Sequence, residues 1–323
     1  MSNRPHITLF TLGGTISAHH SDRLELCDYQ TGHYHAQDFI NALPELSELA
    51  QIEWIPIKNV TSTAIDTFDW FNLKKQIEQQ LKKQDAVVIT QGTNTLEETA
   101  YFLHHTLNTT KPVIITGAQK PFSALGSDAY FNLLNSFRVA ACPAAAGKGV
   151  LTVFNDKIYS AQDVSKTHTY HLEAFQAPNN GPIGRIEANR TVHFMHAPAQ
   201  PHTSSSPYCT IQKPDRAPYI PIVYSHAGAD SQLLEALLQH TQLDGLVIAG
   251  TGAGRCSPKE EQALYSARKQ GIPIVMTSRV GAGGVVPIKY YSNLELITLG
   301  DLSPQKARIW LLLHVLSTNS TTH

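Results

Sequence analysis

Short runs of apolar, often β-branched residues recur along the chain, and each ends at glycine or at polar residues. Runs of this kind are typical of strands that are buried on both faces, as in a parallel sheet. We therefore predict strands over the ranges 7–12, 86–90, 112–116, 149–154, 221–225, 245–250 and 272–277.

Segments with apolar residues at helical spacing lie between these runs. They predict helices over 36–50, 67–84, 95–108, 128–142, 229–241, 258–270 and 304–317. Strand and helix thus alternate almost throughout, which is the sequence form of a doubly wound α/β protein. In such sheets ligands bind beyond the carboxyl ends of the strands, so the polar turns that follow the strands are the first candidates for a site.

One segment breaks the alternation. Residues 196–218, HAPAQPHTSSSPYCTIQKPDRAP, are rich in proline, serine and threonine and have no apolar period, so we interpret them as an interdomain linker. We expect a larger N-terminal domain, residues 1–195, with a doubly wound sheet. A smaller parallel α/β domain should follow over residues 219–323.

Composition narrows the class of protein only a little. Hydrophobic residues make up 42% of the chain and charged residues 16%, and the net charge is −1, which gives no bias toward nucleic acid or an acidic membrane surface. The four cysteines form no C-x-x-C pair, as in a reduced protein. The first apolar run is too short for a secretory signal, and none is long enough to span a membrane. We expect a cytoplasmic protein.

Four polar turns follow predicted strands, and two of them place a threonine where a ligand would bind. Gly13 and Gly14 allow a tight turn before Thr15, and Thr93 follows the second buried run. A threonine hydroxyl is a weak nucleophile that needs a partner to take its proton. Lys166, in a third polar turn, is a candidate for that partner because burial lowers the pKa of a lysine.

Each of these residues also has a purely structural interpretation. A G-G-T turn after a strand is common, and Lys166 alone is most simply a surface charge. Asn94 and Thr95 are both good helix N-caps with a glutamate three residues on, as a capping box requires. Spacing alone therefore predicts no more than an α/β protein with a polar cleft.

The sixteen histidines include pairs at 19–20, 33 and 35, and 104–105. The first two pairs fall on a predicted loop, and we place the third on a helix surface. No spaced carboxylates or cysteines accompany them, so we expect no metal site.

A series of segments spread over nearly the whole chain resembles the landmarks of the bacterial-type L-asparaginase/glutaminase family. In order they are LFTLGGTIS, VVITQGTNTLEETAYF, PVIITGAQKP, GSDAYFNLLNS, GVLTVFNDKIYSAQDVSKTHT, FQAPNNGPIG, AGTGAGR, SRV and SPQKARIWLLL. The resemblance implies a homotetramer of two-domain α/β subunits with sites at the interfaces of paired subunits. It also implies hydrolysis of small amides through a threonine nucleophile, without metal or cofactor.

By position, Thr15 resembles the family nucleophile. Tyr29 resembles a tyrosine that hydrogen-bonds it from a mobile lid over residues 17–34. Thr93 and Lys166 resemble the second threonine and its lysine.

The resemblance also assigns substrate contacts. Ser62 resembles the serine that holds the substrate carboxylate, with Thr63 beside it. Backbone N–H groups near Ala118 and Thr93 would stabilise the oxyanion of the reaction, where one donor is worth about 3 kcal/mol.

The chain departs from the family where the family binds an α-ammonium group. Asn94 stands in place of an aspartate, Thr63 in place of a glutamine, and Ala253 in place of an asparagine from the neighbouring subunit. No counterpart of a further glutamate is found over 286–293. An ammonium group without a counter-charge in a closed site costs several kcal/mol.

We therefore expect an active amidohydrolase whose substrate lacks a free α-amino group, such as a mono-amide of a dicarboxylic acid or an N-acylated or cyclised relative. Two alternatives stay open. The protein is an ordinary L-asparaginase that binds the ammonium through other residues, such as Asp66 or Glu25, or it is a non-catalytic binding protein on the same fold.

Overall fold

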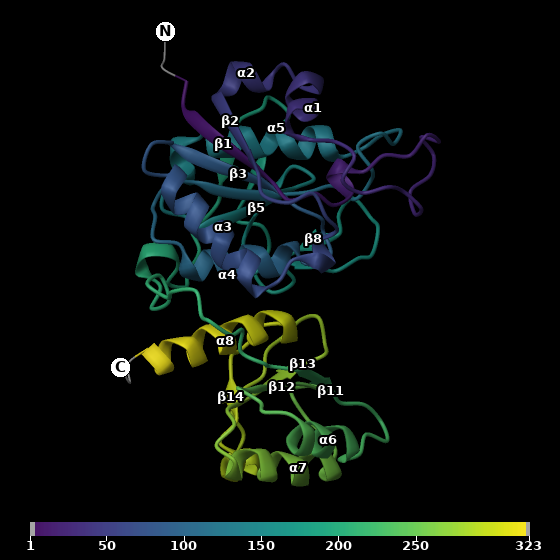
Figure 1. Ribbon diagram of the computed structural model, residues 1–323, viewed down its shortest axis with the longest axis vertical. Coiled ribbons are helices and arrows are strands. Elements are labelled where there is room, and N and C mark those ends of the chain that lie inside the picture. Colours follow the sequence, from purple (N-terminus) through teal and green to yellow (C-terminus); the bar gives the residue numbers. More distant parts are fainter. Residues whose placement is uncertain (1–3, 321–323) are drawn as a thin grey trace. The chain divides into compact units, whose positions relative to one another are not determined.

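The computed structural model describes residues 4–320 (Figure 1). The chain divides into two compact units, with the division between Thr210 and Ile211. This division falls inside the segment 196–218 that the sequence marks as a linker. Each unit is described below by itself.

The first unit is built on an eight-stranded mixed sheet in the order β10-β9-β6-β5-β4-β3-β1-β2. The strands from β5 to β2 run parallel, whereas β6, β9 and β10 extend the sheet antiparallel. Their bounds are β1 His6–Thr11, β2 Gln51–Pro56, β3 Ala86–Thr90, β4 Val113–Thr116, β5 Val150–Phe154, β6 Lys157–Ser160, β9 Gly184–Ile186 and β10 Val192–Phe194. A larger N-terminal α/β unit is confirmed.

Helices cover both faces of this sheet (Figure 1). On one face lie α1 (Ala36–Ala42), α2 (Leu46–Leu49) and α5 (Ala129–Ala140), and on the other lie α3 (Thr67–Gln80) and α4 (Leu96–Thr106). Leu9, Val88 and Ile114 of the central strands pack in one buried cluster with Leu133 and Phe137 of α5. Burial on both faces explains why the sequences of these strands are continuous apolar runs.

The parallel strands have the order β2-β1-β3-β4-β5, so the chain moves one way from β1 to β2 and the other way from β3 onward. The point where the direction of winding changes lies between β1 and β3. In doubly wound sheets a crevice opens at this point beyond the carboxyl ends of the strands. The turns that follow β1 and β3 carry Thr15 and Thr93.

The second unit contains a four-stranded parallel sheet, β11-β12-β13-β14, with α8 on one face and α6 and α7 on the other (Figure 1). The bounds are β11 Ile222–Tyr224, α6 Gln232–His240, β12 Leu246–Gly250, α7 Pro258–Lys269, β13 Ile274–Ser278, β14 Ile297–Thr298 and α8 Pro304–Ser320. Leu234, Leu246, Leu264 and Ile274 belong to its core. This small parallel α/β unit is as predicted.

The structure differs from the predicted elements in several places, including the short strands β7, β8 and β14, which were not predicted. The helix expected over 36–50 is two helices, because Pro44 lies between α1 and α2 and cannot continue a helix. Strand β2 was not predicted since it lies at the sheet edge, and its Trp54 is 44% exposed. The short strands β6, β9 and β10 carry too few residues to show an apolar period.

The segment around residue 205 is packed on the first unit. It contains a short 3-10 helix, Thr203–Ser205, and the ring of His202 lies 5.0 Å from that of His104. Because this segment covers α4, His104 and His105 are buried, and their placement on a helix surface is wrong. The boundaries 1–195 and 219–323 remain our proposal for the domains.

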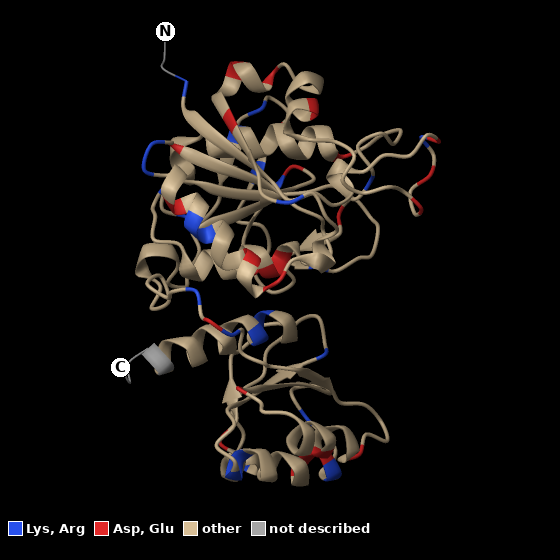
Figure 2. Ribbon diagram, in the orientation of Figure 1, with Lys and Arg blue, Asp and Glu red and all other residues tan. Residues whose placement is uncertain are grey.

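Acidic and basic residues are interspersed along both units (Figure 2). Over residues 4–320, none of the helices is long and apolar enough to cross a membrane.

Gly14 and Gly92 bring the turns after β1 and β3 into direct backbone contact. Gly14 has φ +88°, and a Cβ atom built on it would collide with the Cα and N atoms of Gly92. We predict that Gly14→Ala lowers the free energy of unfolding by at least about 3 kcal/mol, through left-handed strain and this collision together. Denaturant unfolding measures the loss.

Gly147→Ala is the matched control. Gly147 also has a positive φ, +71°, but none of the described heavy atoms lies within 4 Å of a Cβ built there. The Gly147→Ala substitution should lower the free energy of unfolding by about 1–2 kcal/mol, from left-handed strain alone. If both substitutions lowered the free energy of unfolding equally, the close backbone contact between Gly14 and Gly92 would be contradicted.

Candidate active site

A cavity of about 240 Å³ lies at the carboxyl ends of β1 and β3. Six of the residues singled out from the sequence line it, and they come from five separate stretches of chain: Thr15, Tyr29, Ser62, Thr93, Asn94 and Lys166. The fold thus gathers most of the predicted constellation in the place where a doubly wound sheet holds its ligand.

Thr15 begins a short 3-10 helix directly after the glycine turn of β1. Its Oγ1 lies 2.9 Å from the hydroxyl of Tyr29, and either oxygen can be the donor. Tyr29 belongs to a loop closed by reciprocal backbone hydrogen bonds between His19 and Gln30. The tip of this loop is held against the segment between β4 and α5, because the N–H of Leu125 in that segment donates to the carbonyl of Arg23.

Thr93 follows β3 and is only 4% exposed. Lys166 reaches it from β7 (Ser165–Lys166), which pairs with β8 (Phe175–Gln176). The Nζ of Lys166 donates to Thr93 Oγ1 at 2.8 Å and to Asn94 Oδ1 at 3.3 Å. The cavity therefore contains two hydroxyl-centred pairs, Thr15 with Tyr29 and Thr93 with Lys166.

The side chains at the start of α4 do not form a capping box. Thr95 is the N-cap residue, but its side chain makes no capping bond and donates instead to the carbonyl of Ser62 at 2.8 Å. Asn94 accepts from Lys166, and Glu97 accepts from the backbone N–H of Lys166 at 3.0 Å. Thr95 is thus the N-cap residue, as predicted, but the predicted side-chain capping bond is missing, because the Thr95 hydroxyl donates to Ser62.

The pKa of Lys166 is lowered from its ordinary value. Burial is the larger cause, since it disfavours the charged ammonium, and the negative charge of the buried Glu97 acts in the opposite direction. Asn94 offers Lys166 a hydrogen-bond acceptor without a counter-charge. A lysine in this setting loses its proton more readily than a solvated one.

Ser62 is 2% exposed and lines the cavity, whereas its neighbour Thr63 is not among the described residues that line it. The Thr63 hydroxyl lies 3.3 Å from that of Thr61, and the residue is exposed. Ala118 is fully buried and is not among the described residues that line the cavity. Their substrate contacts, and the oxyanion role of the turn around Ala118, remain predictions.

The two acids considered for holding an ammonium already have other partners. Asp66 is the N-cap of α3 and accepts from the N–H of Asp69. Glu25 accepts from the N–H groups of Asp28 and Cys27, and these bonds lower the pKa of its carboxyl. Neither residue lines the cavity.

Sequence reasoning missed several lining residues: Leu26, Cys27, Gln119, Thr169 and Tyr170. Gln119 stands in the polar turn after β4, and nothing in the sequence of that turn assigns a role to this residue. Thr169 and Tyr170 follow Lys166 in the β7–β8 hairpin, so their nearness to the lysine in sequence was the available signal.

Lys166 is the only charged residue among the described residues that line the cavity. The others are small, amide-bearing, hydroxyl-bearing or apolar. The site thus offers hydrogen bonds and one titratable cation, and it offers no carboxylate.

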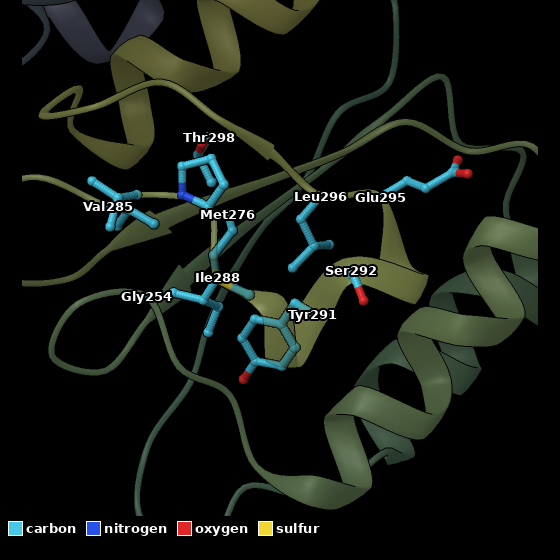
Figure 3. Close-up of a pocket in the computed structure, with 11 residues that line it drawn as sticks. Gly254, Met276, Val285, Ile288, Tyr291, Ser292, Glu295, Leu296 and Thr298 are labelled. Atoms are coloured by element: carbon cyan, nitrogen blue, oxygen red, sulfur yellow. The ribbon is translucent and has the colours of Figure 1, made fainter.

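Within residues 4–320 there is no group of three or more histidine, cysteine, aspartate or glutamate side chains able to hold a metal ion. A second cavity, in the second unit, is lined largely by Met276, Val285, Ile288 and Leu296 (Figure 3). None of the described residues that line it is a lysine or a histidine, and both hydroxyl-centred pairs lie in the cavity of the first unit.

Comparison with known families agrees with this fold. The family described as "Asparaginase, N-terminal" matches residues 6–200, and "Glutaminase/Asparaginase C-terminal domain" matches residues 219–323. The chain belongs to the asparaginase/glutaminase family and is an amidohydrolase of that family.

Individual relatives match over almost the whole chain. "L-asparaginase 2" of Bacillus subtilis (strain 168) is 35% identical over 317 residues, which cover 98% of this chain and 84% of that protein. "Glutaminase-asparaginase" of Pseudomonas fluorescens biotype A is 34% identical over 312 residues, 94% of this chain and 84% of that protein.

A solved structure shares the architecture. The probable cytoplasmic L-asparaginase from Campylobacter jejuni superposes with a TM-score of 0.90 at 34% identity, over 97% of this chain and 95% of that chain.

The pKa of Lys166 should respond to charge on either side of it. Asn94→Asp places a carboxylate beside Nζ, which favours the ammonium and raises the pKa of Lys166. Glu97→Gln keeps an acceptor for the Lys166 N–H but removes the charge that now raises the pKa, so the pKa falls further. NMR titration of isotope-labelled lysines, assigned with Lys166→Arg, measures both. Shifts of the same sign in the two variants would contradict this electrostatic account.

Proposed function

We propose that this protein hydrolyses a small carboxamide that carries a carboxylate but no free α-amino group. The observation that carries the proposal is the charge of the cavity lining: among the lining residues that the structure describes, only Lys166 is charged. An α-ammonium group entering such a cavity loses its hydration and meets a cation-bearing site without a carboxylate. That combination costs several kcal/mol.

The proposed reaction is acyl transfer followed by hydrolysis. The Thr15 oxygen attacks the amide carbon, its proton passes through the hydrogen-bond network to the amide nitrogen, and the C–N bond breaks with release of ammonia. Water then attacks the ester on Thr15 and releases the carboxylic acid, which restores the hydroxyl. The sum is one amide plus one water giving one acid plus ammonia.

Each predicted residue has a place in this scheme. Tyr29, 2.9 Å from Thr15, is in position to exchange a proton with the nucleophile. Lys166 and Thr93 form the second pair, which we propose handles a proton of the attacking water or of the leaving amine. Ser62 is proposed to hold the substrate carboxylate, and the loop that carries Tyr29 is proposed to close the site against water.

The second candidate function is hydrolysis of L-asparagine itself. It is favoured by the printed names of the relatives at about 35% identity, which are L-asparaginases and a glutaminase-asparaginase. For this candidate the counter-charge to the ammonium must come from outside the residues that line the cavity in one chain.

Family membership supports three further proposals. We propose a homotetramer with active sites at the interfaces of paired subunits, the arrangement in which the turn containing Ala253 would face a neighbouring site. We propose that neither metal nor cofactor takes part. A cytoplasmic location is proposed from the free cysteines of the described residues and from the similarity to the Campylobacter jejuni protein.

The two candidate functions differ in their response to the α-amino group. We predict that kcat/KM for succinamate, the des-amino analogue of asparagine, exceeds that for L-asparagine by at least about tenfold, equal to a difference of about 1.4 kcal/mol. Ammonia release under identical conditions measures both.

Thr15→Ala serves as the control, since its ammonia release from either amide should fall to background. A preference for L-asparagine of tenfold or more would establish the second candidate. Absence of ammonia release from every small amide tested would instead favour a binding protein.

A further inference from the structure

We propose that Asn59 is a positioning residue of the active site, whose side-chain amide keeps the hydroxyls of Thr15 and Tyr29 within hydrogen-bonding distance of each other. The inference rests on the proposed function, in which Thr15 is the nucleophile and Tyr29 its proton partner. Asn59 is half-buried and is not among the described residues that line the cavity, so it acts on the reaction through other residues.

The amide of Asn59 connects the two ends of the loop over residues 17–34. Its Nδ2 donates to the carbonyl of Gly32 at 2.8 Å, and its Oδ1 accepts from the hydroxyl of Ser17 at 3.1 Å. Nδ2 also lies 3.4 Å from Nδ1 of His35, the N-cap residue of α1. Because the Gly32 carbonyl can only accept, the nitrogen of the amide must face Gly32 and its oxygen must face Ser17.

Both ends of this bridge are close in sequence to the two hydroxyls. Ser17 is the last residue of the 3-10 helix that Thr15 begins, and it is only 2% exposed. Its hydroxyl shares one hydrogen between the bridging amide and the carbonyl of Gly14, 2.9 Å away. Gly32 is three residues after Tyr29. A displacement at either end therefore reaches one of the two hydroxyls, which lie 2.9 Å apart, through a very short stretch of chain.

The backbone that carries the amide is itself fixed. The N–H of Val60 donates to the carbonyl of Leu12 at 3.1 Å, which joins this segment to the turn after β1. A Cβ atom on Gly13, which has φ +94°, would lie 2.8 Å from the carbonyl carbon of Asn59. A Cβ atom on Gly32 would lie 2.7 Å from the backbone oxygen of Asn59. A side chain on so fixed a backbone can hold two other segments in place.

The effect of the amide on substrate binding should be small. Thr61 and Ser62 follow Asn59 along the chain and line the cavity, but neither receives a hydrogen bond from the Asn59 side chain. An interaction that aligns reacting groups acts in the transition state, so its loss lowers kcat and leaves KM nearly unchanged.

The first test measures kcat and KM in Asn59→Leu, which keeps the size of the side chain and removes both hydrogen bonds. The substrate is whichever of succinamate and L-asparagine the unsubstituted enzyme hydrolyses faster. We expect kcat to fall about tenfold and KM to change less than about twofold.

Asn135→Leu is the matched control. Asn135 of α5 also uses both ends of its amide, since it donates to Asp156 at 2.7 Å and accepts from Arg138 at 2.6 Å. It is not among the described residues that line the cavity. Its kcat should stay within about twofold of that of the unsubstituted enzyme.

The second test repeats the substitution in a Tyr29→Phe background. Without a hydroxyl on residue 29 there is no pair left to align, so Asn59→Leu should lower kcat by less than about twofold in that background. A purely structural role would instead produce the same fold-loss in both backgrounds, and that result would overturn the inference.

Trypsin gives a third readout, which needs no activity. Arg23 is an exposed residue of the loop over 17–34, so the rate of cleavage after it reports how firmly the loop is held. We expect cleavage at least about fivefold faster in Asn59→Leu, and also in Ser17→Ala, which removes the partner of the Asn59 oxygen. The rate should be unchanged in Asn135→Leu. Unfolding midpoints show which variants fold, and Ser17→Ala replaces Asn59→Leu in all three tests if the latter does not.

The inference is overturned if kcat stays within about twofold in the folded variant, or if cleavage after Arg23 is not accelerated. The proposed function fails on different measurements, when the unsubstituted enzyme prefers L-asparagine to succinamate or when Thr15→Ala stays active. If the unsubstituted enzyme or Tyr29→Phe hydrolyses neither amide, the cleavage rate after Arg23 alone decides.

Discussion

The active site depends on one close approach of two backbones, at Gly14 and Gly92. Side chains on either residue would force the turns after β1 and β3 apart, because a Cβ on Gly14 collides with Gly92 and one on Gly92 would lie 3.0 Å from the Cα of Gly14. The residue that follows each of these glycines is a threonine. Contact between the turns is therefore what places Thr15 and Thr93 on one cavity, and the change in winding direction of the sheet is what brings the turns together.

On either side of this contact between the two turns, the site contains one pair of side chains bonded to a threonine hydroxyl. Thr15 with Tyr29 is the proposed nucleophile with its proton partner, and Thr93 with Lys166 places a second hydroxyl beside a lysine whose pKa is lowered by burial. Asn94 joins the second pair as a neutral acceptor for Lys166. In the proposed function, a neutral residue here keeps the lysine readily deprotonated and leaves an α-ammonium group without a counter-charge. Asn94 would then bear on both the acid–base chemistry and the choice of substrate.

Elements were predicted best from the sequence where a single physical cause, such as burial on both faces, determines the residue pattern. Strands β1, β3, β4 and β12 are buried on both faces, so their apolar runs were visible, whereas the edge strand β2 exposes Trp54 and was missed. The polar turns after β1 and β3 followed from the fold class alone, but the partners of Thr15 and Thr93 came from a family resemblance. Gln119 could not be found because an amide in a turn has no spacing signal, and its significance depends on burial. The motif formed by Asn94 and Glu97 predicted a local capping box, but in the fold both side chains accept hydrogen bonds from Lys166, which is distant in sequence.

The central claim is that Thr15, rather than Thr93, forms the covalent bond to the acyl group at this contact between the turns. Rapid acid quench during hydrolysis of succinamate, followed by digestion and mass spectrometry, tests it most directly. The account predicts one added succinyl group on the peptide that contains Thr15, and none on that peptide in Thr15→Ala. A succinyl group on Thr93, in enzyme that turns over normally, would contradict it.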